Sequence, residues 1–279
     1  MHVKVFTDST AGLPTATAAE HNIGIIDVQL RLGERVDDER RFARSEIIDA
    51  MESGERVETS PPDPGAFFWA YQDAVSAGAE AIVSLHISGK MSATAEAARQ
   101  ACQDIRIPVY VVDTETTGMS LGFAVLAAAR AAAEKGDPQS VVGAAQQCYR
   151  NSSELIYVDT LRFLREGGRI GNAAALAGSA LAVRPLLTLQ AGEVNALTKV
   201  TGSKRALGKL TDLAVAHADD RVVNVAVTAL AVGTRERQLQ HELEQRLAAP
   251  GRVMLAHAST VIGAHVGPGA LGITITPNV

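Results

Sequence analysis

The chain has 279 residues, of which 47% are hydrophobic but only 4% aromatic, so its core must consist mainly of small aliphatic side chains. Such a core is typical of helices packed on a buried parallel sheet, and the length allows one large or two modest α/β domains. The formal net charge of −5 and a pI near 5.8 disfavour nucleic acid and anionic lipid surfaces as partners.

Neither the cysteines nor the apolar segments suggest a metal site or a membrane anchor. Cys102 and Cys148 lie far apart without CxxC or Cys/His spacing, so we expect small buried hydrophobes in a reducing compartment and no metal. The first residues have no signal-peptide pattern, and the most apolar helix candidate, Gly118–Ala133, is interrupted by Arg130 and is too short to span a bilayer. We therefore expect a cytoplasmic protein without stable membrane insertion.

The N-terminal half alternates short apolar runs with longer helical patterns. Strands are predicted at Val3–Phe6, Ala81–Leu85 and Val109–Asp113, with alanine-rich segments between them. This alternation indicates βαβ units and a parallel sheet of the Rossmann-like type.

Residues 23–58 interrupt that pattern, and we interpret them as an excursion from the first domain. The excursion contains a strand, a glycine turn, a charged stretch and a short helix at Ser45–Glu52 that Ser45 would cap. The next segment, TSPPDP at Thr59–Pro64, has three prolines and predicts a rigid connector into a helix at Ala66–Ala77.

The C-terminal half has a different pattern. Two strands around Gly192 predict a hairpin, which a purely doubly wound sheet would not contain. We also expect an alanine-rich helix at Asn172–Ala182, a charged helix at Arg235–Ala248, and two final strands around a glycine-rich loop. The fold class is therefore α/β with two domains, an N-terminal parallel-sheet domain over residues 1–155 and a C-terminal mixed-sheet domain over residues 156–279.

Several segments combine residues that could bind an anion. Ser92 follows an apolar strand and precedes a helix, where backbone N–H groups attract anions, although the same segment could serve only as a cap and turn. Arg169 follows a Gly-Gly break and could clamp an anion bidentately, or the glycines could simply end a helix. His265 lies among residues too small to bury it by themselves, but a lone histidine is more often structural than catalytic.

Taken together and in this order, the motifs resemble the DegV family along essentially the whole chain. They are TDST after the first strand, TSPP near residue 60, the segment ending in MSAT, DTETTGMSLG, LRFLREGGRIG, VRPLL and GAHVGPGALG. The resemblance implies two α/β domains that hold one fatty acid in a tunnel, with its carboxylate bound between the domains. It further implies a non-catalytic acyl carrier, without a cofactor, that acts in phospholipid synthesis as a subunit of fatty acid kinase. A separate ATP-using subunit would phosphorylate the bound carboxylate.

The resemblance also assigns roles by motif position. Thr59 and Ser92 would donate hydroxyl hydrogen bonds to the carboxylate, with His265 in the same network and Ser60 and Arg169 in support. Arg205 would contact the kinase partner. Ala93 stands where the family usually has glycine, and alanine disfavours a positive φ at that position.

Two other functions compete with the carrier. An acyl-transfer or hydrolytic enzyme would use Ser92 as nucleophile and His265 as base, with Asp8 or Asp113 as orienting acid, but Ser92 has no GxSxG context. A nucleic-acid-binding regulator would need a basic, aromatic-rich face, which the acidic balance of the chain opposes.

Overall fold

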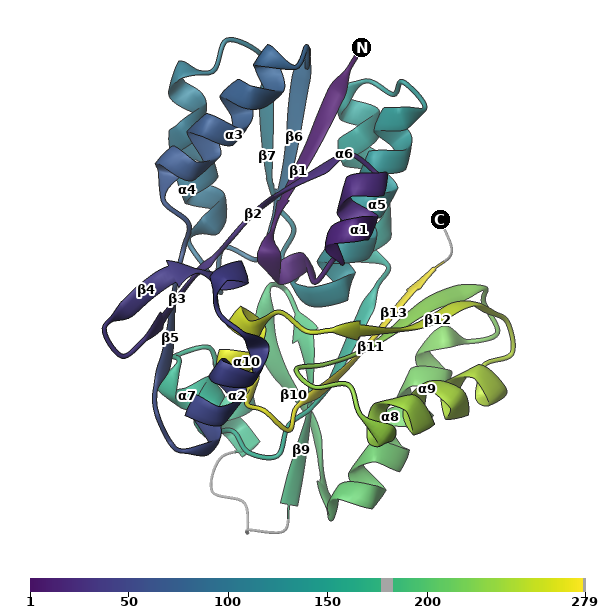
Figure 1. Cartoon of the computed structure of the whole chain (residues 1–279). Coiled ribbons are helices and arrows are strands. Elements are labelled where there is room, and N and C mark those ends of the chain that lie inside the picture. Colours follow the sequence, from purple (N-terminus) through teal and green to yellow (C-terminus); the bar gives the residue numbers. More distant parts are fainter. Residues whose placement is uncertain (177–182, 278–279) are drawn as a thin grey trace.

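A computed structural model describes residues 1–176 and 183–277, and its first sheet is fully parallel (Figure 1). The strand order is β2-β1-β6-β7. The bounds are β1 Val3–Asp8, β2 Ile23–Ile26, β6 Ala81–His86 and β7 Val109–Asp113. Every residue of β6 is buried, because this central strand has helices on both faces. The predicted strands and parallel sheet are confirmed.

Helices cover both faces of this sheet. They are α1 Thr15–Glu20, α3 Pro64–Ser76, α4 Thr94–Ala101, α5 Gly118–Ala133 and α6 Pro138–Arg150, with short 3-10 turns at Ser9–Ala11 and Cys102–Asp104. Phe67 and Tyr71 of α3 pack with α4 on one face, whereas Leu121 and Val125 of α5 pack with α6 on the other. The helix predicted at residues 118–133 has those bounds.

The excursion forms a small antiparallel sheet of its own, with the order β4-β3-β5. Its elements are β3 Gln29–Leu32, β4 Arg35–Asp38, a 3-10 turn at Glu39–Arg41, α2 Arg44–Glu52 and β5 Val57–Ser60. The prediction that Ser45 caps the helix is wrong, because α2 begins one residue earlier, after Ala43, and has no side-chain cap. Thr59 and Ser60 end a strand rather than lying in a loop.

The third sheet is mixed, in the order β10-β9-β8-β13-β11-β12. Its strands are β8 Ser153–Tyr157, β9 Val183–Gln190, β10 Glu193–Thr201, β11 Val223–Ala229, β12 Pro250–His257 and β13 Leu271–Pro277. Only β11 and β12 pair in parallel among these neighbours. The hairpin at Gly192 is confirmed, and α8 Ser203–Ala218 and α9 Thr234–Arg246 pack against this sheet.

The remaining helices differ from the sequence prediction. The glycine-rich segment before β13 contains the helix α10 Thr260–Val266, and α7 spans Arg162–Glu166. Of the helix expected at residues 172–182, residues 171–176 form a 3-10 helix and the rest lies outside the described residues. The domain boundary at residue 155 stays a prediction. Strand β8 crosses that residue and belongs wholly to the mixed sheet. Within residues 1–176 and 183–277, no helix is long and apolar enough to cross a membrane.

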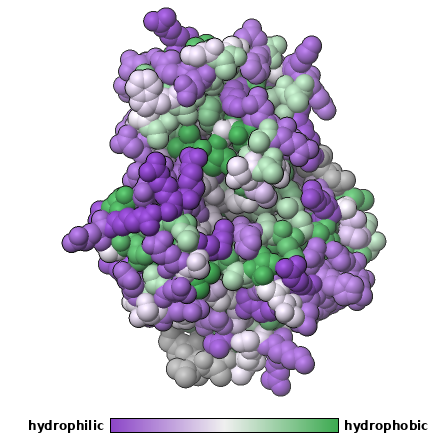
Figure 2. Space-filling view, viewed as in Figure 1, coloured by the Kyte–Doolittle hydropathy of each residue, from purple (hydrophilic) through white to green (hydrophobic). Residues whose placement is uncertain are grey.

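The arrangement brings the three sheets together at the centre of the molecule. In Figure 1 the parallel sheet lies above the mixed sheet, and the small sheet with α2 lies beside α7 and α10. Figure 2 shows hydrophobic side chains across the middle of the same face, between these upper and lower parts. The cavities described below lie in this central region.

Candidate functional site

The carboxyl ends of all four parallel strands open onto one cavity, which we call the front cavity. Thr10 follows β1, Val28 follows β2, Ser92 lies in the loop after β6, and Thr117 lies in the loop after β7. This is the edge where open α/β sheets bind ligands. Other elements complete the wall with mostly aliphatic residues: Ile87, Met91, Ile156, Leu164, Leu189, Val194, Val261, Ile262 and Val266.

The front cavity also brings together five of the residues that the sequence singled out. Thr59, Ser60, Ser92, Arg169 and His265 all line it, although they come from four different parts of the chain. Thr59 Oγ1 lies 2.9 Å from His265 Nε2, and Ser92 Oγ lies 2.8 Å from Thr94 Oγ1. One wall of an otherwise apolar cavity is therefore lined with hydroxyl groups and an imidazole.

Ser92 is positioned by the start of α4. Its neighbour Ala93 has φ −77°, so alanine is accommodated there without a left-handed backbone. The Ser92 amide bonds to the Ser88 carbonyl, and the Ser88 hydroxyl donates to the Gly192 carbonyl of the β9–β10 hairpin at 2.8 Å. The loop that carries Ser92 is thus hydrogen-bonded to the mixed sheet.

His265 is uncharged at neutral pH. Burial and the nearby Arg169 cation lower the pKa of its imidazole to about 4. Its Nδ1 is buried and has no hydrogen-bond partner among the described residues. A Cβ atom on Gly167 would collide with this ring, so the close approach of α7 to His265 requires glycine.

Arg169 binds backbone carbonyls through two of its nitrogens, and the bidentate anion clamp stays a prediction. Its Nε donates to the Met91 carbonyl at 3.0 Å and its Nη1 to the Gly167 carbonyl at 2.6 Å. The alternative prediction for the glycines is confirmed, because Gly167 ends α7 and Gly168 adopts φ +70°. Arg169 thereby ties the Ser92 loop to the end of α7.

Helix α10, which carries His265, is held by a buried acid of the excursion. Glu39 is 9% exposed and its carboxylate accepts hydrogen bonds from Ser259 Oγ at 3.0 Å, Thr260 Oγ1 at 2.9 Å and Thr260 N at 2.5 Å. Arg44 Nη1 adds a bond to the Ala258 carbonyl at 2.5 Å. The excursion, whose strand β5 continues to Thr59 and Ser60, is therefore hydrogen-bonded to the helix that carries His265. This contact could not be read from the sequence, since a charged stretch does not reveal which acid is buried.

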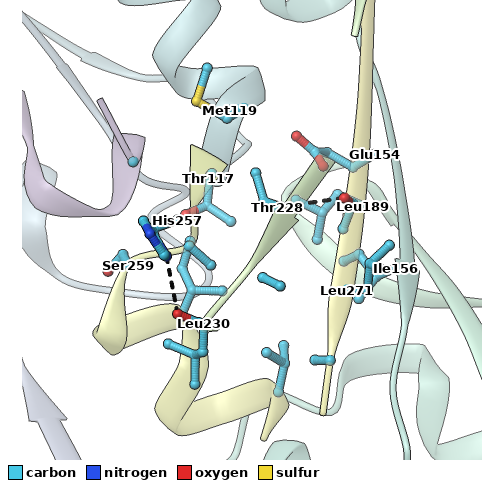
Figure 3. Close-up of a pocket in the computed structure, with 18 of the residues that line it drawn as sticks. Thr117, Met119, Glu154, Ile156, Leu189, Thr228, Leu230, His257, Ser259 and Leu271 are labelled. Carbon is cyan, nitrogen blue, oxygen red and sulfur yellow. Dashed lines mark hydrogen bonds between the residues drawn. The ribbon is translucent and has the colours of Figure 1, made fainter. Parts of the chain in front are cut away.

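A second cavity, the rear cavity, adjoins the first (Figure 3). Five residues line both, namely Thr117, Ile156, Leu189, Ile262 and Val266. The rear cavity extends between α5 and the mixed sheet, and Figure 3 shows Met119, Leu230 and Leu271 around it. The two cavities therefore adjoin through shared walls and are both mainly apolar, with the hydroxyl cluster in the front cavity.

A third, polar depression lies on the other side of the hydroxyl cluster, and we call it the outer pocket. Thr59, Arg169 and His265 line both it and the front cavity. Charged residues form the rest of its polar lining, namely Glu55, Arg56, Glu58, Arg162 and Glu166. These three shared residues thus separate the buried apolar space from an open charged surface.

The enzyme constellation considered from the sequence is not assembled. The Asp8 carboxylate lies 3.0 Å from Nδ1 of His86, not His265, and His86 Nε2 lies 2.7 Å from Ser84 Oγ. Asp113 instead accepts from the amides of Gly89 and Glu115. The Asp8–His86–Ser84 chain is fully buried in the N-terminal core, and none of its members lines a cavity described above.

The remaining predicted residue, Arg205, lies away from these cavities. Arg205 is exposed in the first turn of α8 and lines none of these three cavities. In the part of the chain that the structure describes, no group of three or more His, Cys, Asp or Glu side chains is arranged to hold a metal ion.

The motif resemblance is tested by comparison with known proteins. A family model described as an uncharacterised protein of the DegV family matches residues 2–278. The chain belongs to the DegV family. A DegV domain-containing protein of Streptomyces coelicolor is 39% identical over 276 residues, covering 99% of this chain and 98% of that protein. One from Deinococcus radiodurans is 33% identical and covers 99% of both chains.

Solved DegV structures share the fold over the full length. A fatty-acid-binding DegV family protein from Thermus thermophilus is 28% identical with a TM-score of 0.94, and each chain is covered completely. DegV of Bacillus subtilis, described as a fatty acid binding protein, is 26% identical with a TM-score of 0.90 and the same coverage. The predicted fold class, a parallel N-terminal sheet and a mixed C-terminal sheet, is confirmed.

Proposed function

We propose that the protein binds a long-chain fatty acid, with the acyl chain in the front and rear cavities and the carboxylate at Thr59, Ser92 and His265. The observation that carries the proposal is the pair of adjoining, mainly apolar cavities with a hydroxyl cluster in the wall of the front one. The DegV relatives from Thermus thermophilus and Bacillus subtilis that bind fatty acid support it.

The apolar space suits the chain of such a ligand. Burial contributes about 0.8 kcal/mol per CH₂ group, so aliphatic walls suffice to hold a long chain without specific contacts. The carboxylate has the opposite requirement, because an anion removed from water needs hydrogen-bond donors. A ligand with one anionic end and one long apolar body matches both parts of the cavity.

The hydroxyl groups are arranged to donate. We assign the imidazole proton to Nε2, which then donates to Thr59 Oγ1 across the 2.9 Å contact. This leaves the Thr59 hydroxyl proton free for the carboxylate, and the buried Nδ1 is left as an unpaired acceptor rather than a costlier unpaired donor. Ser92 can donate in the same way when Thr94 supplies the proton of the 2.8 Å contact between them. Ser60 and Arg169 support this cluster from its edge.

We further infer that the carboxylate is presented to a separate ATP-dependent fatty acid kinase subunit. Thr59, Arg169 and His265 line both the front cavity and the outer pocket, so a carboxylate held by them lies close to the surface. A carboxylate oxygen would attack the γ-phosphorus of ATP, the bond to the bridging oxygen would break, and ADP would leave with acyl phosphate as the other product. The exposed Arg205 would contact the kinase, and this chain would be the carrier rather than the catalyst.

The decisive experiment is mass spectrometry of the protein purified from a bacterial host, under native and denaturing conditions with organic extraction. We expect one fatty acid per chain, released on denaturation. A protein that is reproducibly empty and also fails to take up added fatty acid would refute the proposal.

Thr59→Val tests the carboxylate donors in a near-isosteric way. Because a hydrogen bond to a charged group contributes about 1.5–3 kcal/mol, fatty acid affinity should fall about tenfold to a hundredfold. Thr201→Val on the exposed end of β10 is the matched control and should leave affinity unchanged. Equal affinities of the two variants for a fluorescent fatty acid would show that Thr59 does not bind the carboxylate.

A further inference from the structure

A buried carboxyl group lies in the wall of the rear cavity, away from the hydroxyl cluster. Glu154 begins the apolar stretch of β8, is 8% exposed and lines the rear cavity but not the front one. Figure 3 shows its side chain beside the space bounded by Met119 and Thr228. Most of the rear-cavity lining is apolar, whereas on another side Glu154 also lines a polar pocket with Ser120, Tyr149 and Arg150. A carboxyl group between the two needs an explanation.

Helix and sheet contacts account for only half of the carboxyl group. Its Oε1 accepts hydrogen bonds from the Ser120 amide in the first turn of α5 at 2.9 Å and from Thr274 Oγ1 of β13 at 2.7 Å. Its Oε2 receives no hydrogen bond within 3.5 Å from the described residues. A neutral amide or hydroxyl could satisfy the Ser120 and Thr274 donors equally well, so these contacts do not require an acid.

The carboxyl group is protonated at neutral pH. Burial raises the pKa of Glu154 to about 8, and the hydrogen bonds from Thr274 and Ser120 only partly oppose the effect. With Oε1 accepting both bonds, the proton belongs on Oε2. Oε2 therefore carries an O–H donor for which the described residues supply no hydrogen-bond acceptor within 3.5 Å, and such a donor in the wall of an apolar cavity is costly unless a ligand pairs with it.

We propose that Glu154 recognises an acyl chain that carries a hydrogen-bond-accepting oxygen, such as a hydroxyl group, along its length. This inference rests on the proposed function, since it places the carboxylate of the chain at Thr59 and the body of the chain in the rear cavity. Glu154 is then a specificity-determining residue that distinguishes an oxygenated chain from a plain one. The five residues common to both cavities provide the continuous wall along which the chain passes from the carboxylate end to Glu154.

The test compares stearate with a positional series of monohydroxystearates, in which the hydroxyl moves carbon by carbon along the chain. One position should bind at least as tightly as stearate, whereas positions that miss Glu154 should bind about tenfold more weakly, because their hydroxyl is buried unpaired. The readout is the affinity ratio of each hydroxystearate to stearate, which a purely structural role of Glu154 would not change. Uniform weakening at every position would overturn the inference.

Three variants complete the design. Glu154→Gln retains a donor and should preserve the favoured position, whereas Glu154→Leu should lower the ratio at that position about tenfold while still binding stearate. Thr274→Val removes a contact to Oε1 without removing the donor, and should leave the ratio unchanged. An unchanged ratio in Glu154→Leu refutes the role of Glu154, and if that variant does not fold, the positional series still decides. Failure of stearate itself to bind would instead refute the proposed function.

Discussion

Replacing Glu39 by alanine should release α10 from the excursion and so disturb the contact between His265 and Thr59. The carboxylate accepts from Ser259 Oγ, Thr260 Oγ1 and Thr260 N, and it lies 3.4 Å from Val261 N. Val261 N keeps a second acceptor in Ser259 Oγ at 3.2 Å, so the donors that lose their acceptor are the Thr260 amide and the Ser259 and Thr260 hydroxyls.

The magnitude follows from these contacts. A buried donor without a partner costs about 1–3 kcal/mol, and each of the two lost hydroxyl bonds contributes about 0.5–1.5 kcal/mol. The free energy of unfolding of Glu39→Ala should therefore fall by about 2–6 kcal/mol. Because α10 carries His265, the affinity for a fatty acid should fall in the variant even under conditions where it remains folded.

Urea unfolding followed by circular dichroism measures the first effect, and displacement of a fluorescent fatty acid measures the second. Glu39→Gln keeps an acceptor for the Thr260 amide and should lose less stability than the alanine variant. Glu34→Ala, at an exposed acid of the same excursion, should stay within about 0.5 kcal/mol of the wild type. An unfolding free energy for Glu39→Ala equally close to the wild type would show that the hydrogen bonds of Glu39 to Ser259 and Thr260 do not stabilise the fold.

Two other predictions follow from the site. Gly167→Ala places a Cβ against the His265 ring and should lower the free energy of unfolding in urea by about 1–3 kcal/mol. In the control Gly143→Ala of α6, the new Cβ meets nothing within 4 Å, so this variant should be more stable by about 0.5–1 kcal/mol. Similar effects of both substitutions would contradict the close packing of Gly167 against His265. Because the pKa of Glu154 is raised from 4.5 to about 8, the folded state holds this proton more tightly than the unfolded state, and stability is lost as pH rises between these values. At about 1.4 kcal/mol per pH unit, this loss of unfolding free energy reaches at most about 5 kcal/mol. Glu154→Gln should abolish the part of the pH dependence that Glu154 causes. Unfolding free energies of the wild type and the variant that run parallel from pH 5 to 8 would contradict the raised pKa.

The sequence was most informative where local pattern and tertiary environment agree. Alternating apolar strands and alanine-rich helices predicted the parallel sheet, since strands buried on both faces have near-continuous apolar runs. The turn chemistry at Gly192 predicted the hairpin of the mixed sheet. The motifs also selected residues that converge on one cavity, although motif order carries no distances.

The contacts between distant segments could not be predicted. Arg169 looked like an anion clamp because its side chain suits that role, but its bonds to the Met91 and Gly167 carbonyls depend on two loops meeting in space. Ser45 has the chemistry of a helix cap, yet α2 begins at Arg44, whose guanidinium reaches the Ala258 carbonyl. The sequence carries one signal for Glu154, since an acid at the start of an apolar strand is unusual, but it does not show which cavity that acid lines.

Helix α5 has a consequence for how the molecule holds together. One side of it packs into the N-terminal core through Leu121 and Val125, while Met119 and Phe123 pack with Ala226 and Met254 of the mixed sheet. Neither half of the chain can therefore be removed without exposing an apolar face of the other. Unfolding should accordingly be a single cooperative transition rather than two, and a fragment that ends near residue 155 should be prone to aggregation.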